Sequence, residues 1–146
     1  MKQNKFNLLL VIAFVLGVGL ACNLNDEKDR VETRPQAKNQ KLESYTIRGL
    51  KFSYYKIPAN LSREDLIKTA TELHADEPDA QLILIDDDSK LAEYVKYAKE
   101  ISNSNYDAEL PKEWADKHIV ANLQKYVSGK FMLCEGNGYK EIAEIQ

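Results

Sequence analysis

The apolar positions of the chain fall into one long run and a later set of short periodic patterns. The run covers residues 8–20 without a charged or polar side chain. Residues 23–44 are almost free of large apolar side chains and mix both charges. Such a stretch cannot bury enough apolar surface to order itself. The pattern therefore predicts a signal segment over residues 1–21, a disordered tether over residues 22–44 and one folded domain over residues 45–146.

The first part of the predicted domain has the pattern of a strand, a helix and a second strand. Residues 45–56 alternate between apolar and polar side chains, and the phase changes at Gly49, which predicts either a β-bulge or a hairpin turn there. Ser62 precedes acidic residues and then apolar residues at helical spacing, so it predicts the start of a helix that packs on the sheet. The short apolar run over residues 81–85 predicts a buried strand.

The second part predicts a clear amphipathic helix over residues 91–101 and a short helix that begins at Pro111. Residues 118–127 suit either a helix or a strand, and we favour the strand. A strand over residues 131–134, a Gly-Asn-Gly turn and a returning strand over residues 139–145 complete the chain.

These elements predict the α+β class. We expect a single small domain in which two main helices pack on a mostly antiparallel sheet, with a C-terminal hairpin or meander. We expect Trp114, the only tryptophan, to fasten the short helix to the core rather than to stack on a ligand.

Net charge limits the class of partner. The whole chain has 20 basic and 23 acidic residues. Lys2 and Lys5 are the only charged residues before Cys22, so the chain from Cys22 onward keeps 18 basic against 23 acidic residues. An acidic surface argues against a nucleic-acid partner and against adsorption to membranes through basic residues.

The first 22 residues have the form of an export signal. Lys2 and Lys5 precede the apolar run, and small residues lead from the run to Cys22. A cationic start, an apolar core of about 7–15 residues and a small-residue end are typical of a signal peptide, whereas a spanning helix needs about 20 apolar residues. We therefore expect this segment to be cleaved.

The tetrapeptide Gly19-Leu20-Ala21-Cys22 resembles a bacterial lipobox. The resemblance implies that Cys22 is acylated, becomes the new N-terminus and anchors a lipoprotein to a membrane of the bacterial cell envelope. Asn23 resembles the residue that follows the cysteine in lipoproteins sent to the outer membrane of a didermal bacterium, facing the periplasm or the surface. Ordinary cleavage after Ala21 is the alternative and gives a soluble secreted or periplasmic protein. An uncleaved N-terminal anchor is a third interpretation.

Asp86, Asp87 and Asp88 form the most chemically suggestive cluster. They follow a predicted buried strand, where open α/β sheets often bind ligands, and carboxylate oxygens suit Mg²⁺ and Ca²⁺. The cluster lacks the alternating ligands and the glycine of a calcium loop. The simpler expectation is that Asp88 or Ser89 caps the next helix while Asp86 and Asp87 are solvated.

The remaining chemically active residue types have ordinary structural explanations. We expect His74 to be a partly exposed residue at a helix end and His118 to be a strand-end residue that could join the acidic cluster. We expect Cys134 to be a small buried side chain on a strand. It would be free to pair with Cys22 only if Cys22 is not acylated. The pattern contains no catalytic spacing and indicates no cofactor.

Three tyrosines are candidates for partner binding. Tyr54 and Tyr55 are adjacent and therefore point to opposite faces of a strand, so we expect one of them to be exposed. Tyr97 lies off the apolar stripe of its helix, and tyrosine is enriched in contact surfaces. The sequence favours a non-enzymatic protein-interaction module, such as an inhibitor, exclusion or assembly factor, with an envelope protein as partner. The alternative is a lipoprotein that binds a small molecule or a divalent cation through residues 86–88.

Overall fold

The computed structural model describes residues 39–146, so the signal segment, Cys22 and most of the predicted tether lie outside the described residues. This part of the chain has six strands and three helices: β1 (Gln40–Ile47), β2 (Leu50–Lys56), α1 (Arg63–Asp76), β3 (Ala80–Ile85), α2 (Leu91–Ser102), α3 (Lys112–His118), β4 (Ile119–Lys125), β5 (Phe131–Glu135) and β6 (Glu141–Ile145). None of these helices is long and apolar enough to cross a membrane.

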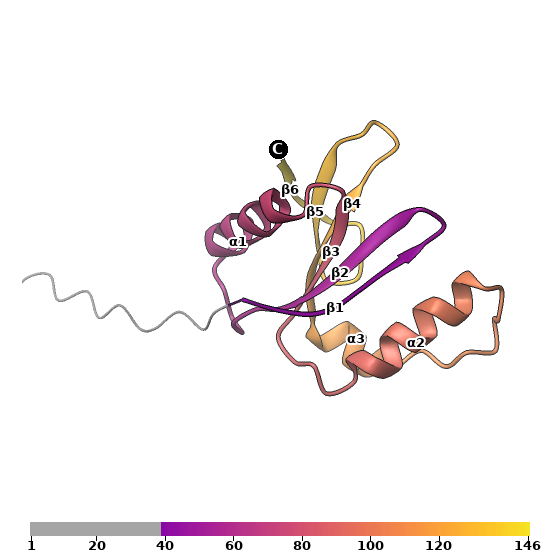
Figure 1. Cartoon of the computed structure of the whole chain (residues 1–146). Helices are drawn as coiled ribbons and strands as arrows, with labels where there is room; N and C mark the ends of the chain where they lie inside the picture. The colour runs from indigo at the N-terminus through magenta and orange to yellow at the C-terminus, as the bar shows by residue number, and fades with distance from the viewer. Residues whose placement is uncertain (1–38) are drawn as a thin grey trace, which may run out of the picture. The chain divides into compact units, whose positions relative to one another are not determined.

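The six strands form one sheet in which spatial order follows chain order, β1-β2-β3-β4-β5-β6. Only β2 and β3 are parallel, because α1 carries the chain back between them, and the other four pairs are antiparallel. Figure 1 shows α1 on one side of the sheet and α2 with α3 on the other. The predicted α+β class and the mostly antiparallel sheet are confirmed, with the short α3 as a third helix.

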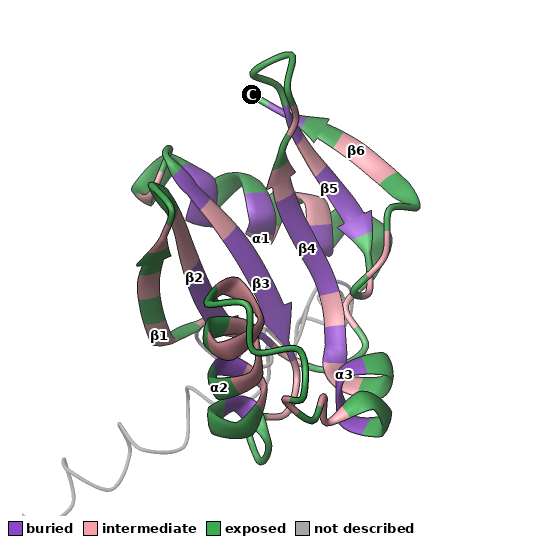
Figure 2. Cartoon of the chain, turned by 90° about the vertical axis from the view of Figure 1, so that its right-hand side faces the viewer, coloured by how far each residue is buried: buried purple, intermediate pink, exposed green. Residues whose placement is uncertain are grey.

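Each face of the sheet has its own hydrophobic core, because alternate residues of a strand point to opposite faces. On β3, Leu82 and Leu84 pack in the core under α1, and Ile83 and Ile85 pack in the core under α2 and α3. We call these the α1 core and the α2/α3 core. Figure 2 shows most of β3 and β4 in the purple of buried residues, as strands with a core on each face require.

The phase change at Gly49 is a hairpin turn between β1 and β2 rather than a β-bulge. Arg48 and Gly49 have φ values of 49° and 83°, the pair of positive φ angles that a tight two-residue hairpin turn requires. The strand that precedes the turn begins at Gln40, so the predicted boundary between tether and domain at residue 45 is wrong. The main chain of Gln40 and Lys41 pairs with β2, and strand pairing of this kind needs no apolar side chain.

The helices and the later strands agree closely with the sequence pattern. Ser62 caps α1 and accepts a hydrogen bond from the backbone of Asp65. The strand interpretation of residues 118–127 is confirmed by β4, although His118 is the last residue of α3 rather than a strand end. Trp114 is buried in the α2/α3 core, as expected. The C-terminal hairpin of β5 and β6 is also present, and Cys134 is fully buried on β5.

The prediction for His74 is wrong. Its side chain is buried near the end of α1, and its ring centroid lies 4.2 Å from that of Phe131 on β5. The last turn of α1 therefore packs on the sheet instead of ending in solvent. Burial lowers the pKa of His74, although the negative charge of Asp79 acts in the opposite direction.

Candidate functional site

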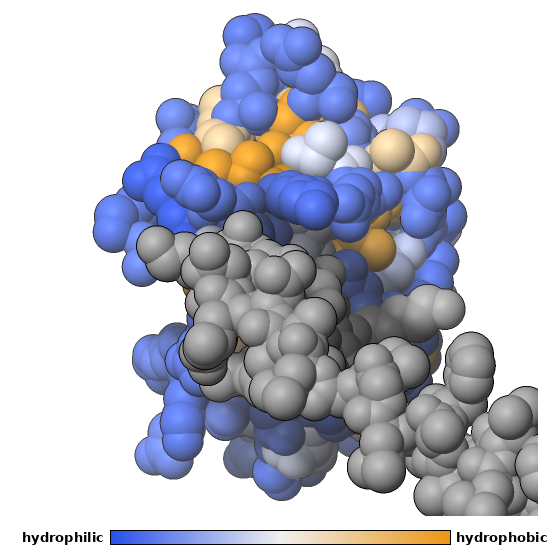
Figure 3. All heavy atoms as spheres, turned by 90° about the vertical axis from the view of Figure 1, so that its left-hand side faces the viewer, coloured by the Kyte–Doolittle hydropathy of each residue, from blue (hydrophilic) through white to orange (hydrophobic). Residues whose placement is uncertain are grey.

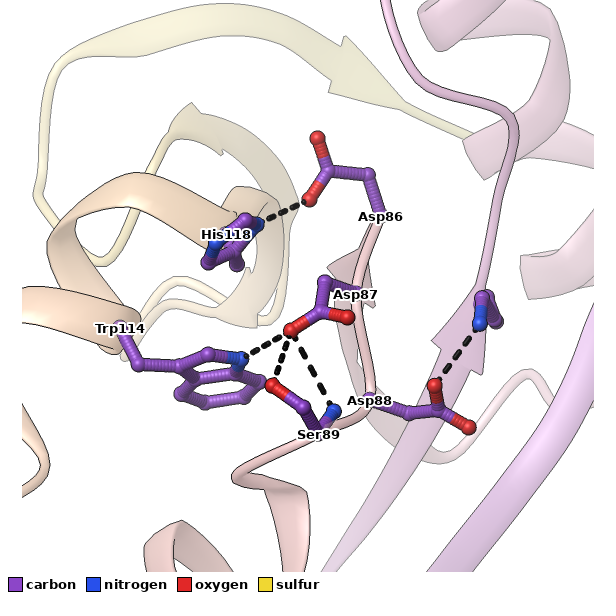
Figure 4. Close-up of polar contacts among 7 residues, drawn as sticks. Asp86, Asp87, Asp88, Ser89, Trp114 and His118 are labelled. Atoms are coloured by element: carbon purple, nitrogen blue, oxygen red, sulfur yellow. Dashed lines mark hydrogen bonds and ion pairs between the residues drawn. The ribbon is translucent and has the colours of Figure 1, made fainter.

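The predicted acidic cluster lies in the loop between β3 and α2. Its three carboxylates turn toward different neighbours, as Figure 4 shows: Asp86 toward His118, Asp87 toward Trp114 and Ser89, and Asp88 toward Lys56. The distances are 2.8 Å to Nδ1 of His118, 2.9 Å to Nε1 of Trp114 and 2.7 Å to Nζ of Lys56. The loop is thereby fastened to α3 on one side and to β2 on the other.

This arrangement does not assemble a metal centre from the described residues. Within residues 39–146, no three His, Cys, Asp or Glu side chains converge on one point that could hold a metal ion. The pKa of Asp87 is lowered by hydrogen bonds from Ser89 and then Trp114, and the pKa of Asp88 is lowered by the hydrogen bond from Lys56. The carboxylates are therefore used as acceptors for neighbouring elements.

The capping prediction for this loop is wrong. Residue Lys90 precedes α2 and makes no side-chain cap, while Asp87 accepts hydrogen bonds from the backbone and hydroxyl of Ser89 inside the loop. Asp86 and Asp87 are half-buried rather than simply solvated. An aspartate can hydrogen-bond to the backbone two residues further on, and this turn competes with a helix cap.

The three candidate tyrosines do not form one surface. Tyr54 and Tyr55 point to opposite faces of β2 as expected, but only 2% and 6% of their surfaces are exposed. The expectation that one of them is exposed is wrong, because helices cover both faces of β2. Tyr97 on α2 is half-buried, with its ring centroid 6.4 Å from that of Tyr94.

Tyr55 belongs instead to a charged network around Glu77 that the sequence did not reveal. The Glu77 carboxylate lies 2.6 Å from Nζ of Lys41 and 2.5 Å from Nζ of Lys51, and it accepts hydrogen bonds from Ser53 and Tyr55. Burial alone would raise the pKa of Glu77, but these donors outweigh burial and lower the pKa to about 2. The network ties the end of α1 to β1 and β2.

A cleft with a different chemistry lies on the other face of the sheet, beside α2. Its volume is about 270 Å³. Its apolar floor includes aromatic side chains from β1, β2 and α2 that contact one another. Ring centroids lie 5.6 Å apart for Tyr45 and Phe52, and 6.2 Å apart for Tyr54 and Tyr94. In Figure 2, α2 and α3 cover the lower part of this face of the sheet, and the upper part of β3 and β4 has no helix over it.

Four amide side chains also line the cleft: Gln81 on β3, Asn122 and Gln124 on β4, and Asn137 in the turn between β5 and β6. We call this site the amide cleft. Asn122 is almost fully buried and donates to the carbonyl oxygens of Gly136 and Gly138 at 2.6 and 3.1 Å. It also accepts a hydrogen bond from Gln124. Asn122 therefore holds the β5–β6 turn against β4.

The amide cleft carries no charge in the described part of the chain. None of the residues that line it is Asp, Glu, Lys, Arg or His, although 29% of the chain is charged. Burial raises the pKa of Tyr45, of Tyr54 and of Tyr94, the last to about 12. These hydroxyls therefore stay protonated at any physiological pH.

Comparisons with protein-family models, with curated proteins and with solved structures find no match.

The sequence contains one signal of the amide cleft, the pair Asn122 and Gln124. Asn122 and Gln124 occupy alternate positions of an otherwise apolar stretch, so both point to the same face of β4. A buried amide needs hydrogen-bond partners, which makes such a pair unusual on a core face. The Gly-Asn-Gly turn also has a second role, because Asn137 accepts a hydrogen bond from the Tyr94 hydroxyl at 3.1 Å.

Proposed function

We propose that this chain is a lipid-anchored, non-enzymatic binding protein of the bacterial envelope, and that its folded domain takes a small uncharged ligand in the amide cleft. The observation that carries the proposal is the lining of the cleft, which combines an aromatic floor with amide groups and contains no charged side chain. Ligand sites are usually concave and mostly apolar, with a few placed polar groups that fix orientation.

The size of the cleft indicates a small ligand. Pockets for drug-sized molecules span about 300–1,000 Å³, and the amide cleft has a volume of about 270 Å³. A ligand with one ring, or one ring of a longer molecule, matches this volume. Asn137 and Tyr139 in the turn between β5 and β6, and Tyr94 and Ala98 on α2, also line the cleft.

The titratable groups of the cleft support binding over catalysis. They are all tyrosines, and burial raises the pKa of three of them. A general acid or base works best with a pKa near the operating pH. The other candidate pair, Asp86 with His118, lies in the β3–α2 loop and is not part of the cleft lining, and no hydroxyl or thiol of residues 39–146 hydrogen-bonds to His118.

The sequence suggested two functions, a protein-interaction module and a protein that binds a small molecule or a cation. The burial of the candidate residues supports the second more than the first. The protein-interaction hypothesis took Tyr54, Tyr55 and Tyr97 as its candidate surface, but Tyr54 and Tyr55 are buried and Tyr97 is half-buried. The small-molecule hypothesis relied on the acidic loop, whose carboxylates are engaged by His118, Trp114 and Lys56. The amide cleft supports the second class of function at a different site.

Anchoring through Cys22 is the part of the proposal that rests on the sequence. A signal segment that ends in the lipobox-like tetrapeptide supports a chain that starts at an acylated Cys22, on the outer membrane if the bacterium is didermal. Intact mass spectrometry of the protein from its own membranes tests this. The expected mass is that of residues 22–146 plus the lipid. A lipid-free chain that gains two hydrogens on reduction would contradict it and indicate a bridge between Cys22 and Cys134.

A screen of small fragments by NMR tests the ligand site. The full chain, labelled with ¹⁵N, is mixed with neutral and charged fragments of matched size, and the side-chain amide signals are followed. We expect neutral fragments to shift the signals of Gln81, Gln124 and Asn137, while the signal of the exposed Gln40 on β1 serves as the control. Shifts that map away from the cleft, or equal binding of charged fragments, would contradict the proposal.

A further inference from the structure

We infer that the ligand of the amide cleft is a neutral saccharide, with one face of a sugar ring on the aromatic floor and its hydroxyl groups on the amides. The inference rests on the proposed function of the cleft as a ligand site. It is argued from three properties of the lining: the exposed faces of its rings, the free ends of its amides and its lack of charge.

The aromatic floor matches the apolar face of a sugar ring. Tyr45, Phe52 and Tyr94 are half-buried, so part of each ring is left uncovered in a cleft that all three line. A pyranose ring has C–H groups on one face, and burial of such apolar surface against an aromatic ring is favourable. Tyr139 adds a ring that is 79% exposed to the rim of the cleft.

The amides match the hydroxyl groups of a sugar. An amide side chain has a donor nitrogen and an acceptor oxygen on the same carbon, so it can bind two neighbouring hydroxyls, each of which also donates and accepts. Within residues 39–146, Gln81 makes no side-chain hydrogen bond, and the oxygen of Gln124 and the nitrogen of Asn137 have no partner. These groups are available to a ligand.

Two of these amides are already held in place. The nitrogen of Gln124 donates to Asn122 and, at 3.3 Å, to the carbonyl oxygen of Gly138. The oxygen of Asn137 accepts from the Tyr94 hydroxyl. A group that is fixed before binding loses less conformational entropy when the ligand arrives, so the free ends of Gln124 and Asn137 are well prepared for hydrogen bonds.

The absence of charge in the described lining selects among saccharides. A phosphate or a carboxylate on the sugar would enter a partly buried site whose lining has no cation to compensate its lost hydration. Two cations at the edge of the site are already engaged: Nζ of Lys99 lies 4.8 Å from the centroid of the Tyr45 ring, and Arg48 donates to the main-chain oxygen of Ser102. Uncharged hydroxyl groups have no such penalty when amides satisfy them. The inference is therefore limited to neutral sugars.

The position of the cleft argues against an extended peptide. Peptides that bind sheets in extended form pair with the free edge of an outer strand. The amide cleft lies over the face of β1, β2, β3 and β4, and its amides on β3 and β4 belong to strands that are paired on both edges. Its recognition groups are side chains, as a ligand without a peptide backbone requires.

The test is a titration of the ¹⁵N-labelled full chain in a zwitterionic detergent without a sugar headgroup. The probes are maltotriose, cellotriose and the trimer of N-acetylglucosamine, with trigalacturonate as the charged counterpart. We expect at least one neutral trimer to give saturable shifts of the Gln81, Gln124 and Asn137 amide signals. Trigalacturonate should bind at least about tenfold more weakly, since the lining of the cleft offers its carboxylates no cation.

Matched variants separate the cleft from the rest of the surface. Gln124→Ala removes a hydrogen-bonding amide and should weaken binding about tenfold, whereas Gln40→Ala, outside the cleft, should leave the affinity within about twofold. Gln81→Ala is a second cleft variant, so that a folding defect in one variant does not decide the result. Equal affinity of the two cleft variants and the wild type would overturn the inference.

Two further probes distinguish failure of the saccharide inference from failure of the proposed function. They are adenosine and an uncharged, blocked glycine dipeptide. If the neutral sugars leave the cleft signals unchanged and one of these probes shifts them, the saccharide inference is overturned while the cleft remains a ligand site. If none of the probes shifts the signals, both proposals fail.

Discussion

The two faces of the sheet differ in what their side chains do, although the same strands build both. Toward α1, the central strands present Leu82, Leu84, Ala121 and Leu123, all fully buried in the α1 core. Toward α2, the alternate residues of the same strands are of two kinds. Ile83 and Ile85 of β3 are aliphatic and pack in the α2/α3 core, and Gln81 of β3 with Asn122 and Gln124 of β4 are the amides of the amide cleft. A strand with a period of two can therefore carry stability on one face and ligand chemistry on the other.

The two sides of the domain also differ in the chemistry of their outer surfaces. The surface seen from the side of α1 in Figure 3 is mostly hydrophilic where the described residues are visible, with some apolar side chains among them. Arg63, Glu64 and Asp65 in the first turn of α1 are exposed. The α1 face is therefore a closed core under a solvated helix, while the opposite face leaves a concave uncharged site.

The largest effect on stability should come from a cavity in the α1 core. Leu84→Ala removes a fully buried side chain from the α1 core. We expect the free energy of unfolding to fall by about 2–5 kcal/mol, through lost burial and the cavity that remains. Urea unfolding of the full chain, followed by the fluorescence of Trp114, measures the change. Gln81→Ala on the opposite face, where the side chain makes no hydrogen bond within residues 39–146, is the control and should change it by about 0.5 kcal/mol or less. Equal losses from both variants would contradict the division between the faces.

The charged network at the end of α1 should give the next largest effect. Glu77→Gln removes the negative charge that Lys41 and Lys51 share, and we expect a loss of about 1–3 kcal/mol at neutral pH. The folded-state pKa of Glu77 is about 2, below its ordinary value of 4.5. The unfolded state therefore binds more protons between these values, so the contribution of Glu77 is fully present above about pH 4.5 and is lost as the pH falls toward 2.

Urea unfolding between pH 7 and pH 3 measures this dependence. The wild type should lose stability more steeply than Glu77→Gln as the pH falls below about 4.5, because the variant has no carboxylate at this position to protonate. Parallel curves for the two proteins would show that the network makes no pH-dependent contribution. The amide cleft has no part in this effect, since the titratable groups that line it are tyrosines that stay neutral.

The sequence was sufficient for elements whose pattern is local. The cap at Ser62, the apolar stripe of α2 and the C-terminal hairpin each depend on residues close together in the chain, and each is confirmed. Burial of Cys134 and Trp114 also followed from residue type.

Features that depend on which element covers which face were not predictable in this way. Tyr54 and Tyr55 are equivalent in the sequence pattern, and only the placement of α1 and α2 on opposite faces buries both. The amide cleft joins Gln81 to Gln124 and Asn137 across strands far apart in the chain. Glu77 had the pattern of a loop acid, and its partners come from β1 and β2.

A smaller pH effect on the α1 face should come from His74. Burial lowers the pKa of His74 in the folded state, and within residues 39–146 its Nδ1 is buried without a hydrogen-bond partner. The unfolded state then binds the proton more tightly, so stability is lost as the pH falls through the ordinary pKa of 6.5. We expect His74→Leu to remove this loss and to change stability at pH 8 by about 1 kcal/mol or less. Unfolding midpoints between pH 8 and pH 5 check it, and an unchanged pH dependence in the variant would contradict the assignment.

The smallest effect on stability should come from the loss of one hydrogen bond in the amide cleft. Tyr94→Phe keeps the ring in the α2/α3 core and removes only the hydroxyl that donates to Asn137. Because Asn137 is exposed, we expect the unfolding free energy to change by about 0.5 kcal/mol or less. The β5–β6 turn should nevertheless open more often, because one of its links to α2 is lost. Hydrogen–deuterium exchange should therefore become faster at residues 136–139 and stay unchanged in β3, and unchanged exchange in the turn would show that Tyr94 does not hold the cleft in shape.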